Sequence, residues 1–221
     1  MENLGKNLRG RDLSGQRLFG AELNGADLFQ CKLVKAKMSG AELNQANLSQ
    51  ADLTGASLNR AQLKQADLTQ ANLTEAKLHE AELNGANFTG ANLTGTDFNG
   101  AIAEGAIFTS AVFANNDFSS CNLTSANLES GQLSGAVFNN AKLHSANLRN
   151  ANLEKANLTG ADLTSADLSG SRLAGAMLSK ANFHNANLSG ANLLGVNLYS
   201  ANFTGAKLAG ATMPDGTVKP H

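Results

Sequence analysis

Cysteines and histidines are the side chains of this chain best suited to nucleophilic catalysis or to zinc binding. The sequence has two cysteines and four histidines: Cys31, Cys121, His79, His144, His184 and His221. Serine, threonine and carboxylate residues are frequent, but no G-x-x-x-x-G-K-[ST] phosphate loop or dinucleotide-binding fingerprint occurs. Whether any of these groups meet depends on the elements that position them.

Composition excludes several classes of function. The net charge of −1 gives no bulk reason to expect binding to nucleic acid or to an anionic membrane. The first residues, MENLGKNLRGRDLSG, contain no apolar run, and no stretch approaches the roughly 20 apolar residues of a membrane span. We therefore expect a cytoplasmic protein, with a processed export signal as the alternative.

A five-residue period runs through the chain from Leu8 to Met213. Every fifth residue, here called the centre, is Leu, Phe or Met, with the exception of Ala103. Alanine fills most positions two residues before a centre, and 20 of the 22 glycines lie at positions divisible by five. Because no insertion interrupts the 42 consecutive units, the pattern indicates a repeat architecture.

Neither a helix nor a plain strand can bury this pattern. In an α-helix, five residues advance the side-chain direction by about 140°, so the centres would point all round the axis. In a strand, side chains alternate with period two, and five is odd. Short extended segments separated by turns satisfy the pattern, so we expect a polygonal β-solenoid with five residues on each side.

The spacing of the phenylalanines predicts how many sides make one coil. Four pairs of centre phenylalanines are 20 residues apart, whereas one pair is 15 apart: Phe88–Phe108, Phe98–Phe118, Phe118–Phe138 and Phe183–Phe203 against Phe98–Phe113. Stacked positions recur at the coil length, so four sides are favoured. With coils about 4.8 Å apart, roughly ten coils form a rod about 50 Å long.

The segments AELNGADLFQ, ANLTEAKLHE and ANLEKANLTGADLTSADLSG resemble the A(D/N)LXX motif of the pentapeptide repeat family. The closing GATMPDGT is also similar to the tail of many such proteins, which are abundant in cyanobacteria. The resemblance implies an all-β fold, a right-handed quadrilateral parallel β-helix of about ten coils of four pentapeptides. We expect one domain over residues 1–221, with in-phase repeats at about 6–213 and a short tail at 214–221.

In such a solenoid the reactive side chains are kept apart. Cys31 and Cys121 are 18 units apart, which puts them on opposite sides and about 20 Å apart along the rod, too far for a disulfide. His144 and His184 share one face, but two coils separate them by about 10 Å, too far to share a zinc ion. We expect no catalytic, cofactor or metal site and no enzymatic activity, with both cysteines as buried substitutes for alanine.

Charged side chains are arranged in columns. Three basic residues each precede a glutamate by five positions, namely Arg17 before Glu22, Lys37 before Glu42 and Lys77 before Glu82. We expect them to pair across one corner of the rod, either as solvated pairs or as a docking surface for a partner. Asparagines in consecutive units, from Asn182 to Asn202, are expected to form structural amide ladders.

Apolar residues at positions that should face solvent form three groups. Near the ends of the chain they are Phe19, Phe29, Val34, Leu194 and Tyr199, and in the middle they are Ile102, Ile107 and Val112. They are either structural variation or contact surfaces, and those at the ends favour end-to-end self-association that covers unpaired edges. Neither flank resembles a capping helix, so we expect the terminal coils to expose unpaired edges. We expect Ala103 to compensate for the large Phe98, Phe108 and Phe113 in its coil.

These patterns favour a non-enzymatic rod that serves as an interaction or scaffold module for an unidentified protein partner. The alternative is a DNA-mimicking regulator of a topoisomerase such as gyrase, a role that the resemblance implies because some family members inhibit or protect gyrase. That role requires a strongly acidic surface, whereas acidic and basic residues are nearly balanced here. We expect no nucleic-acid or membrane partner.

Overall fold

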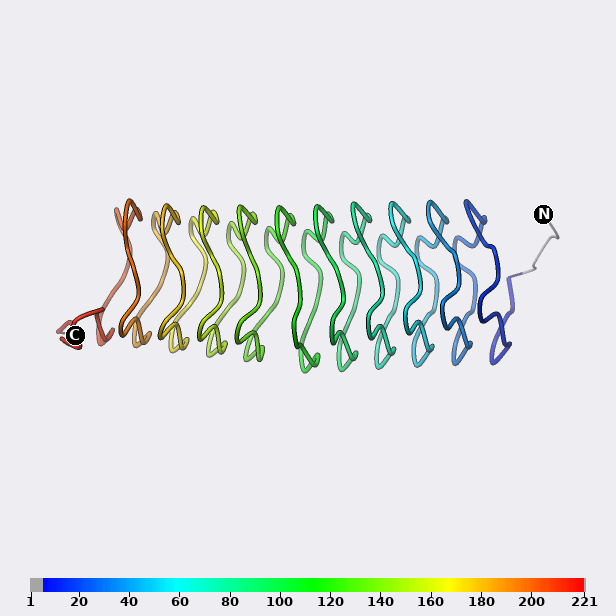
Figure 1. Ribbon diagram of the computed structural model, residues 1–221, viewed down its shortest axis with the longest axis horizontal. Coiled ribbons are helices and arrows are strands. Elements are labelled where there is room, and N and C mark those ends of the chain that lie inside the picture. Colours follow the sequence, from blue (N-terminus) through cyan, green and yellow to red (C-terminus); the bar gives the residue numbers. More distant parts are fainter. Residues whose placement is uncertain (1–5, 221) are drawn as a thin grey trace.

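The computed structural model describes residues 6–220 as a straight rod of stacked coils, with the two ends of the chain at opposite ends of the rod (Figure 1). The bridges that join neighbouring coils are parallel and link residues 20 apart, from Asn7 with Asp27 to Asn192 with Thr212. Four pentapeptides therefore make one coil, as the phenylalanine spacing predicted.

Each pentapeptide contributes one bridge residue and then a two-residue turn, and no helix occurs in residues 6–220. Within a unit such as 21–25, the small residue is first, the bridge residue second, the centre third and the turn fourth and fifth. We number the faces of the rod by their first centres: face 1 starts at Leu8, face 2 at Leu13, face 3 at Leu18 and face 4 at Leu23. Face 1 carries an unbroken ladder of bridges from Asn7 to Lys207.

Backbone hydrogen bonds between coils satisfy the polar groups of each side. The centre Leu48 donates its N–H to the carbonyl of Asp67 (2.7 Å), and Asp67 donates its own N–H to the carbonyl of Ala46 (2.9 Å). Within the unit, the N–H of Ala51 closes the turn on the carbonyl of Leu48 (3.0 Å). Because a buried, unpaired N–H or C=O is costly, this regular ladder keeps the rod in register.

The turn explains the glycine period. The fifth residue of each described unit from Gly10 to Gly210 has a positive φ, between 54° and 73°. Glycine adopts this conformation without steric cost, as at Gly95 (φ +67°). Where another residue stands there, stacking along the rod adds hydrogen bonds, as in the column in which Gln30 donates to Gln50 (2.9 Å) and Gln50 donates to Gln70 (3.1 Å).

The core consists of the centre side chains, which stack in columns along the rod, with the small residues beside them. Phenylalanines 20 apart stack face to face, with ring centroids 4.9 Å apart in Phe88–Phe108 and 4.8 Å apart in Phe98–Phe118. Rings on opposite faces meet edge to face, as Phe98 and Phe108 do at 6.0 Å. Ala103, the centre that lies between Phe98 and Phe108 in the sequence, is fully buried. That its small side chain compensates for the volume of these rings stays a prediction.

One rung of the ladder is missing on face 2, between the segments 110–115 and 129–134. Four inter-coil bonds present at equivalent places elsewhere are absent here among residues 6–220, including those from Phe113 N to the carbonyl of Gln132 and from Gln132 N to the carbonyl of Ala111. The bridge between Val112 and Gln132 is also absent. Figure 1 shows the corresponding wider step between two green coils along the lower edge of the rod.

Large side chains account for this open rung. Three successive centres, Phe108, Phe113 and Phe118, are phenylalanine, and their rings lie 6.1–6.2 Å apart. The next small position holds Asn116, whose buried Nδ2 donates to the carbonyl of Leu93 (2.6 Å) while its Oδ1 has no partner. Overpacking displaces backbone, and Phe113 is 7% exposed at mid-rod, where most centres are fully buried.

The C-terminal tail covers part of the last coil. Residues 214–220 fold back so that Thr212 and Val218 form an antiparallel bridge, and Met213 N donates to the carbonyl of Thr217 (2.7 Å). The expectation of unpaired edges is therefore wrong for part of this end, because a short reversed segment, which is not a helix, pairs with the edge. Residues 1–5 and 221 lie outside the described part.

Candidate interaction surfaces

A side-chain hydrogen bond explains why Asn and Asp dominate the second position of the units. Each of the 23 Asn or Asp residues at that position in 6–220 accepts a hydrogen bond at Oδ1 from the backbone N–H two residues later; two examples are Thr89 N to Asn87 (3.0 Å) and Thr54 N to Asp52 (3.0 Å). This is the local geometry of an Asx turn. The fold therefore favours Asn or Asp at the second position. A different residue there gives up this hydrogen bond, so its presence calls for another explanation.

Ile102, Ile107 and Val112, which we call the belt, occupy the second position in three consecutive units on faces 4, 1 and 2. Their exposed fractions are 41%, 39% and 54%. The prediction that they face solvent on consecutive sides of one coil is confirmed. None of them can accept the Asx hydrogen bond, so the belt exposes apolar surface and also loses a stabilising contact of the fold.

The segment that contains the belt has several carboxylates and no basic residue. Residues 78–141 contain no Lys or Arg but six acidic residues: Glu80, Glu82, Asp97, Glu104, Asp117 and Glu129. Lys64, Arg60 and Arg149, from outside this segment, form ion pairs with Glu82, Glu80 and Glu129. Asp97, Glu104 and Asp117 have no ion-pair partner within residues 6–220. The belt coil is thus both apolar and acidic on its outside.

The predicted ion pairs across one corner are wrong. Residues five apart lie on neighbouring faces that point in different directions, whereas residues 18 or 20 apart stack along the rod. Glu82 accordingly pairs with Lys64 (2.7 Å), not with Lys77, and Glu42 accepts from Nδ2 of Asn24 (2.8 Å), not from Lys37. Arg17 lies over the ring of Phe19, 5.6 Å from its centroid, and not against Glu22.

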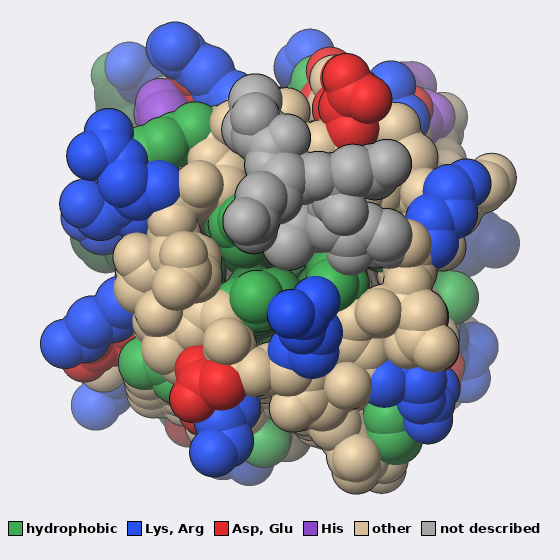
Figure 2. Space-filling view, turned by 90° about the vertical axis from the view of Figure 1, so that its right-hand side faces the viewer, with side chains coloured by type: hydrophobic (Ala, Val, Ile, Leu, Met, Phe, Trp, Pro, Cys, Tyr) green, Lys and Arg blue, Asp and Glu red, His purple; other side chains and the backbone are tan. Residues whose placement is uncertain are grey.

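Contacts stacked along the rod change the electrostatic environment of single carboxyls. Arg60 donates to Glu80 (2.6 Å), and this hydrogen bond lowers the pKa of the Glu80 carboxyl. Both side chains are largely solvent-exposed, so the pair contributes little to stability. Seen along the axis from the N-terminal end, Lys and Arg side chains project around the rim of the rod (Figure 2).

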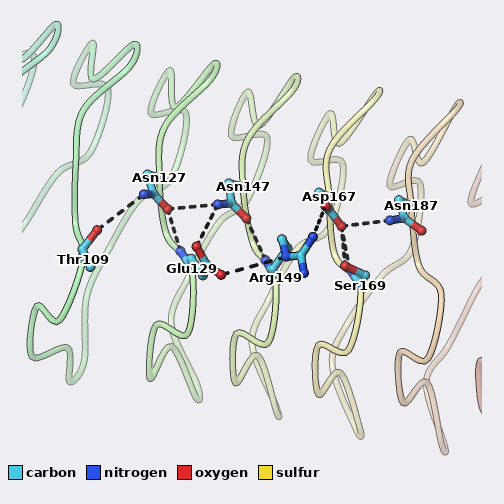
Figure 3. A network of polar contacts seen from close by, with 8 residues as sticks. All are labelled: Thr109, Asn127, Glu129, Asn147, Arg149, Asp167, Ser169 and Asn187. Atoms are coloured by element: carbon cyan, nitrogen blue, oxygen red, sulfur yellow. Dashed lines mark hydrogen bonds and ion pairs between the residues drawn. The ribbon is translucent and has the colours of Figure 1, made fainter.

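Face 1 carries a continuous polar network (Figure 3). Asn147 donates to Asn127 (3.2 Å), and Arg149 lies between Glu129 (3.9 Å) and Asp167 (3.6 Å) in the coils on either side. The amide ladder predicted for Asn182 to Asn202 forms between residues 20 apart, as in Asn202 donating to Asn182 (2.9 Å). Asparagines in consecutive units lie on different faces and do not stack, so the ladders run along the rod.

The cysteines are buried free thiols, as predicted. Burial raises the pKa of both thiols, and Sγ of Cys31 donates to the carbonyl of Leu8 (2.8 Å), so neither is set up as a nucleophile. No group of three or more His, Cys, Asp or Glu side chains in residues 6–220 could hold a metal ion. His221 lies outside the described residues.

The apolar residues near the ends differ in how they are covered. Phe29 and Val34 are half-buried, not exposed as expected, and the guanidinium of Arg9 lies 4.3 Å from the ring centroid of Phe29. Phe19, Leu194 and Tyr199 are exposed as predicted, with Tyr199 at 68%. The sequence interpretation missed two exposed apolar residues, Met177 and Val218. Met177 occupies the second position, so its departure from Asn or Asp was the available signal.

A four-sided solenoid with regular polar faces is typical of repeat proteins, and here one apolar belt interrupts those faces. The chain belongs to the pentapeptide repeat family: the family's sequence model, described as pentapeptide repeats, matches eight copies, with matched ranges that extend over residues 31–213. No helix among the described residues is long and apolar enough to cross a membrane.

Solved structures of the same family resemble the chain over most of its length. HetL from the cyanobacterium Nostoc sp. strain PCC 7120, a pentapeptide repeat protein involved in regulating heterocyst differentiation, is 33% identical, with 97% of this chain and 94% of HetL covered and a TM-score of 0.41. QnrB1, a plasmid-mediated fluoroquinolone resistance protein, is 21% identical over 92% of this chain and 91% of its own, with a TM-score of 0.40.

A pentapeptide repeat protein from the Arabidopsis thaliana thylakoid lumen is 27% identical, with 61% of this chain and 69% of that protein covered and a TM-score of 0.22. Among curated proteins, none matches this chain. The right-handed sense of the coil stays a prediction.

Proposed function

We propose that this chain is a non-enzymatic rod that binds a protein partner through the belt of Ile102, Ile107 and Val112. The observation that carries the proposal is the loss of the Asx hydrogen bond at three consecutive second positions in favour of exposed apolar side chains. Core packing does not require these residues, since they point outward. Proteins commonly sacrifice local stability where a surface has a function. A cytoplasmic location stays a prediction.

The triple variant Ile102→Asn, Ile107→Asn, Val112→Asn tests the proposal. Asparagine accepts the Asx hydrogen bond at the second position elsewhere, so we expect β-rich circular dichroism to be retained and the thermal midpoint to be unchanged or higher. We expect the proteins co-purified from native cell extract by the tagged wild-type chain to be lost. Met177→Asn is the matched control, because Met177 is 49% exposed at the same position of its unit but lies away from the belt. Unchanged partners and unchanged oligomeric mass in the triple variant would show that the belt is structural.

We propose two secondary contact surfaces for the same rod. The first comprises the charged residues near the N-terminal half: Arg17, Glu22, Lys37, Glu42, Lys77 and Glu82. The second is the pair of rod ends, where Phe19, Leu194 and Tyr199 expose apolar surface and Phe29 lies under Arg9. End-to-end association predicts a mass in sedimentation equilibrium that rises with protein concentration, and a constant monomer mass contradicts it.

The alternative is a DNA-mimicking regulator of gyrase, and the acidic segment 78–141 is the observation that favours it. Lys and Arg outnumber acidic residues on both sides of that segment, in residues 6–77 and 142–220, so a continuous acidic surface does not extend along the rod. A gyrase supercoiling assay with added protein separates the two functions. No effect at micromolar protein removes the alternative and leaves the interaction module.

A further inference from the structure

Ile102, Glu104 and Ile107 form a ridge at the corner between faces 4 and 1. The two isoleucines bridge to the coils on both sides, Ile107 to Asn87 and Asn127, so their backbone is held in place. Glu104 is exposed in the turn between them and accepts from Nδ2 of Asn122 (2.7 Å). The ridge therefore presents a carboxylate with an aliphatic side chain before it and another after it.

The charge of the ridge is not compensated within the rod. Several glutamates outside the belt coil meet a cation, as Glu154 meets Arg172 (2.7 Å) and Glu80 meets Arg60 (2.6 Å), whereas Glu75 does not. Glu104 has no such partner in residues 6–220, and neither do Asp97 and Asp117, which lie before and after the belt on face 3 in successive coils. A surface of this sign attracts cationic partners and repels anionic ones.

The open rung of face 2 adds main-chain groups to the same surface. Val112 is the most exposed residue of the belt, and the N–H groups of Phe113, Ala114 and Asn115, which follow it, make no hydrogen bond within residues 6–220. Polar main-chain groups without a partner beside exposed apolar surface are suited to hydrogen bonding with a docked segment. Apolar, acidic and polar features thus follow one another round the coil.

We infer that the belt binds a segment of a partner protein in which Lys or Arg residues are interspersed with aliphatic side chains. This inference rests on the proposed function and specifies the chemistry of the partner. Cations of the segment pair with Glu104 and its unpaired neighbours, and the aliphatic side chains cover Ile102, Ile107 and Val112. Nucleic acids and anionic membranes are disfavoured by the charge. An acidic segment is disfavoured for the same reason.

Three labelled model peptides test this chemistry with the full chain by fluorescence anisotropy: one of Leu, Lys and Ser, one with Glu in place of Lys, and one with Ser in place of Leu. We expect the Leu–Lys peptide to bind most tightly and the Leu–Glu peptide not to bind. Glu104→Gln and Ile107→Asn should each weaken binding of the Leu–Lys peptide about tenfold, the size of a contact at the centre of an interface.

Two control variants carry the same chemical changes away from the belt. Glu75→Gln removes an exposed carboxylate without an ion-pair partner, and Met177→Asn removes an exposed apolar side chain. Both should bind the Leu–Lys peptide like the wild type. If all four variants bind the Leu–Lys peptide equally, the peptide is adsorbed without contacting the belt, and the inference is overturned. Tighter binding of the Leu–Glu peptide than of the Leu–Lys peptide would also overturn it, and so would the absence of binding by any peptide.

Failure of this inference is distinguishable from failure of the proposed function. If the triple Asn variant loses its co-purified proteins while the peptides do not discriminate, the belt is a contact surface whose partner has a different chemistry. If the triple variant keeps every partner and its mass, the proposed function fails first.

Discussion

At the residue scale, the second position of the pentapeptide does most to fix the local backbone. An Asn or Asp there accepts a hydrogen bond from the N–H of the fourth residue, a group that the ladder between coils leaves without a partner. At Asn87 this contact comprises two hydrogen bonds, because both N and Oγ1 of Thr89 donate to its Oδ1 (3.0 and 2.6 Å). The preference for Asn and Asp is thus a backbone requirement of the turn.

The variant Asn87→Ala should lower the free energy of unfolding by about 0.5–1.5 kcal/mol, the usual net contribution of one hydrogen bond. Lys142→Ala is the control, since Lys142 occupies the same position without such a bond. Thermal midpoints followed by circular dichroism compare the two. An equal decrease in both variants would show that the Asx bond adds nothing to stability.

At the element scale, the rod is a series of nearly identical rungs, and among residues 6–220 the bridge between neighbouring coils is missing at one rung, on face 2. The bonds missing there include those from Phe113 N and Gln132 N, although equivalent bonds from Leu93 N to Val112 (2.8 Å) and from Val112 N to Ala91 (2.9 Å) are present one coil earlier. A repeat protein is stabilised by contacts between neighbouring units, so a lost rung weakens the rod locally. The rod is therefore expected to open first at mid-length.

Hydrogen exchange should detect this weakness. The amides of Phe113 and Gln132 should exchange faster than those of Leu93 and Val112, because only the latter pair donates to a carbonyl of a neighbouring coil. Phe113→Leu removes ring volume from the overfilled coil and should slow exchange at Gln132. Mass spectrometry of proteolytic fragments measures both effects.

Phe138→Leu is the matched control for the exchange experiment, since Phe138 stacks on Phe118 in a coil whose ladder is intact at that face. It should not slow exchange at Gln132. Slow exchange at Phe113 in the wild type would contradict the open rung, and an unchanged rate in Phe113→Leu would contradict overpacking as its cause.

At the scale of the whole molecule, the rod keeps ionisable side chains at its surface. The only buried polar residues in 6–220 are Thr96, Asn116 and Ser171, and no Asp, Glu, His, Lys or Arg side chain is fully buried there. Hydrogen bonds lower the pKa of several exposed carboxyls, including that of Asp27 through Arg9 and that of Asp215 through Thr217. Stability should consequently depend on pH only in acid.

We expect the thermal midpoint to be nearly constant from about pH 8 to pH 5 and to fall below about pH 4. A carboxyl whose pKa is lower in the folded state stabilises the fold above its unfolded pKa. That contribution is lost as the pH decreases through the folded pKa, because the unfolded chain then binds protons more readily. A large change in midpoint near pH 6–7 would contradict this, since it would require a histidine with a perturbed pKa. Thermal scans in a pH series provide the measurement.

The sequence alone determined the architecture, because a strict five-residue period with apolar centres is compatible with one kind of backbone. The pairing of Phe88 with Phe108 also revealed four sides, and the outward position of Ile102, Ile107 and Val112 followed from the period. All of these depend on the direction in which each residue points, and the period fixes that direction.

Only the tertiary structure decided which side chains become neighbours along the rod and how well each coil packs. Glu82 pairs with Lys64 and not with Lys77 because residues 18 apart stack, whereas residues five apart turn a corner. The open rung beside Phe113 results from the summed volumes of one coil and its neighbours, and the cap from a reversal of the chain after Met213. These features depend on distances between coils, which a pattern along one chain does not contain.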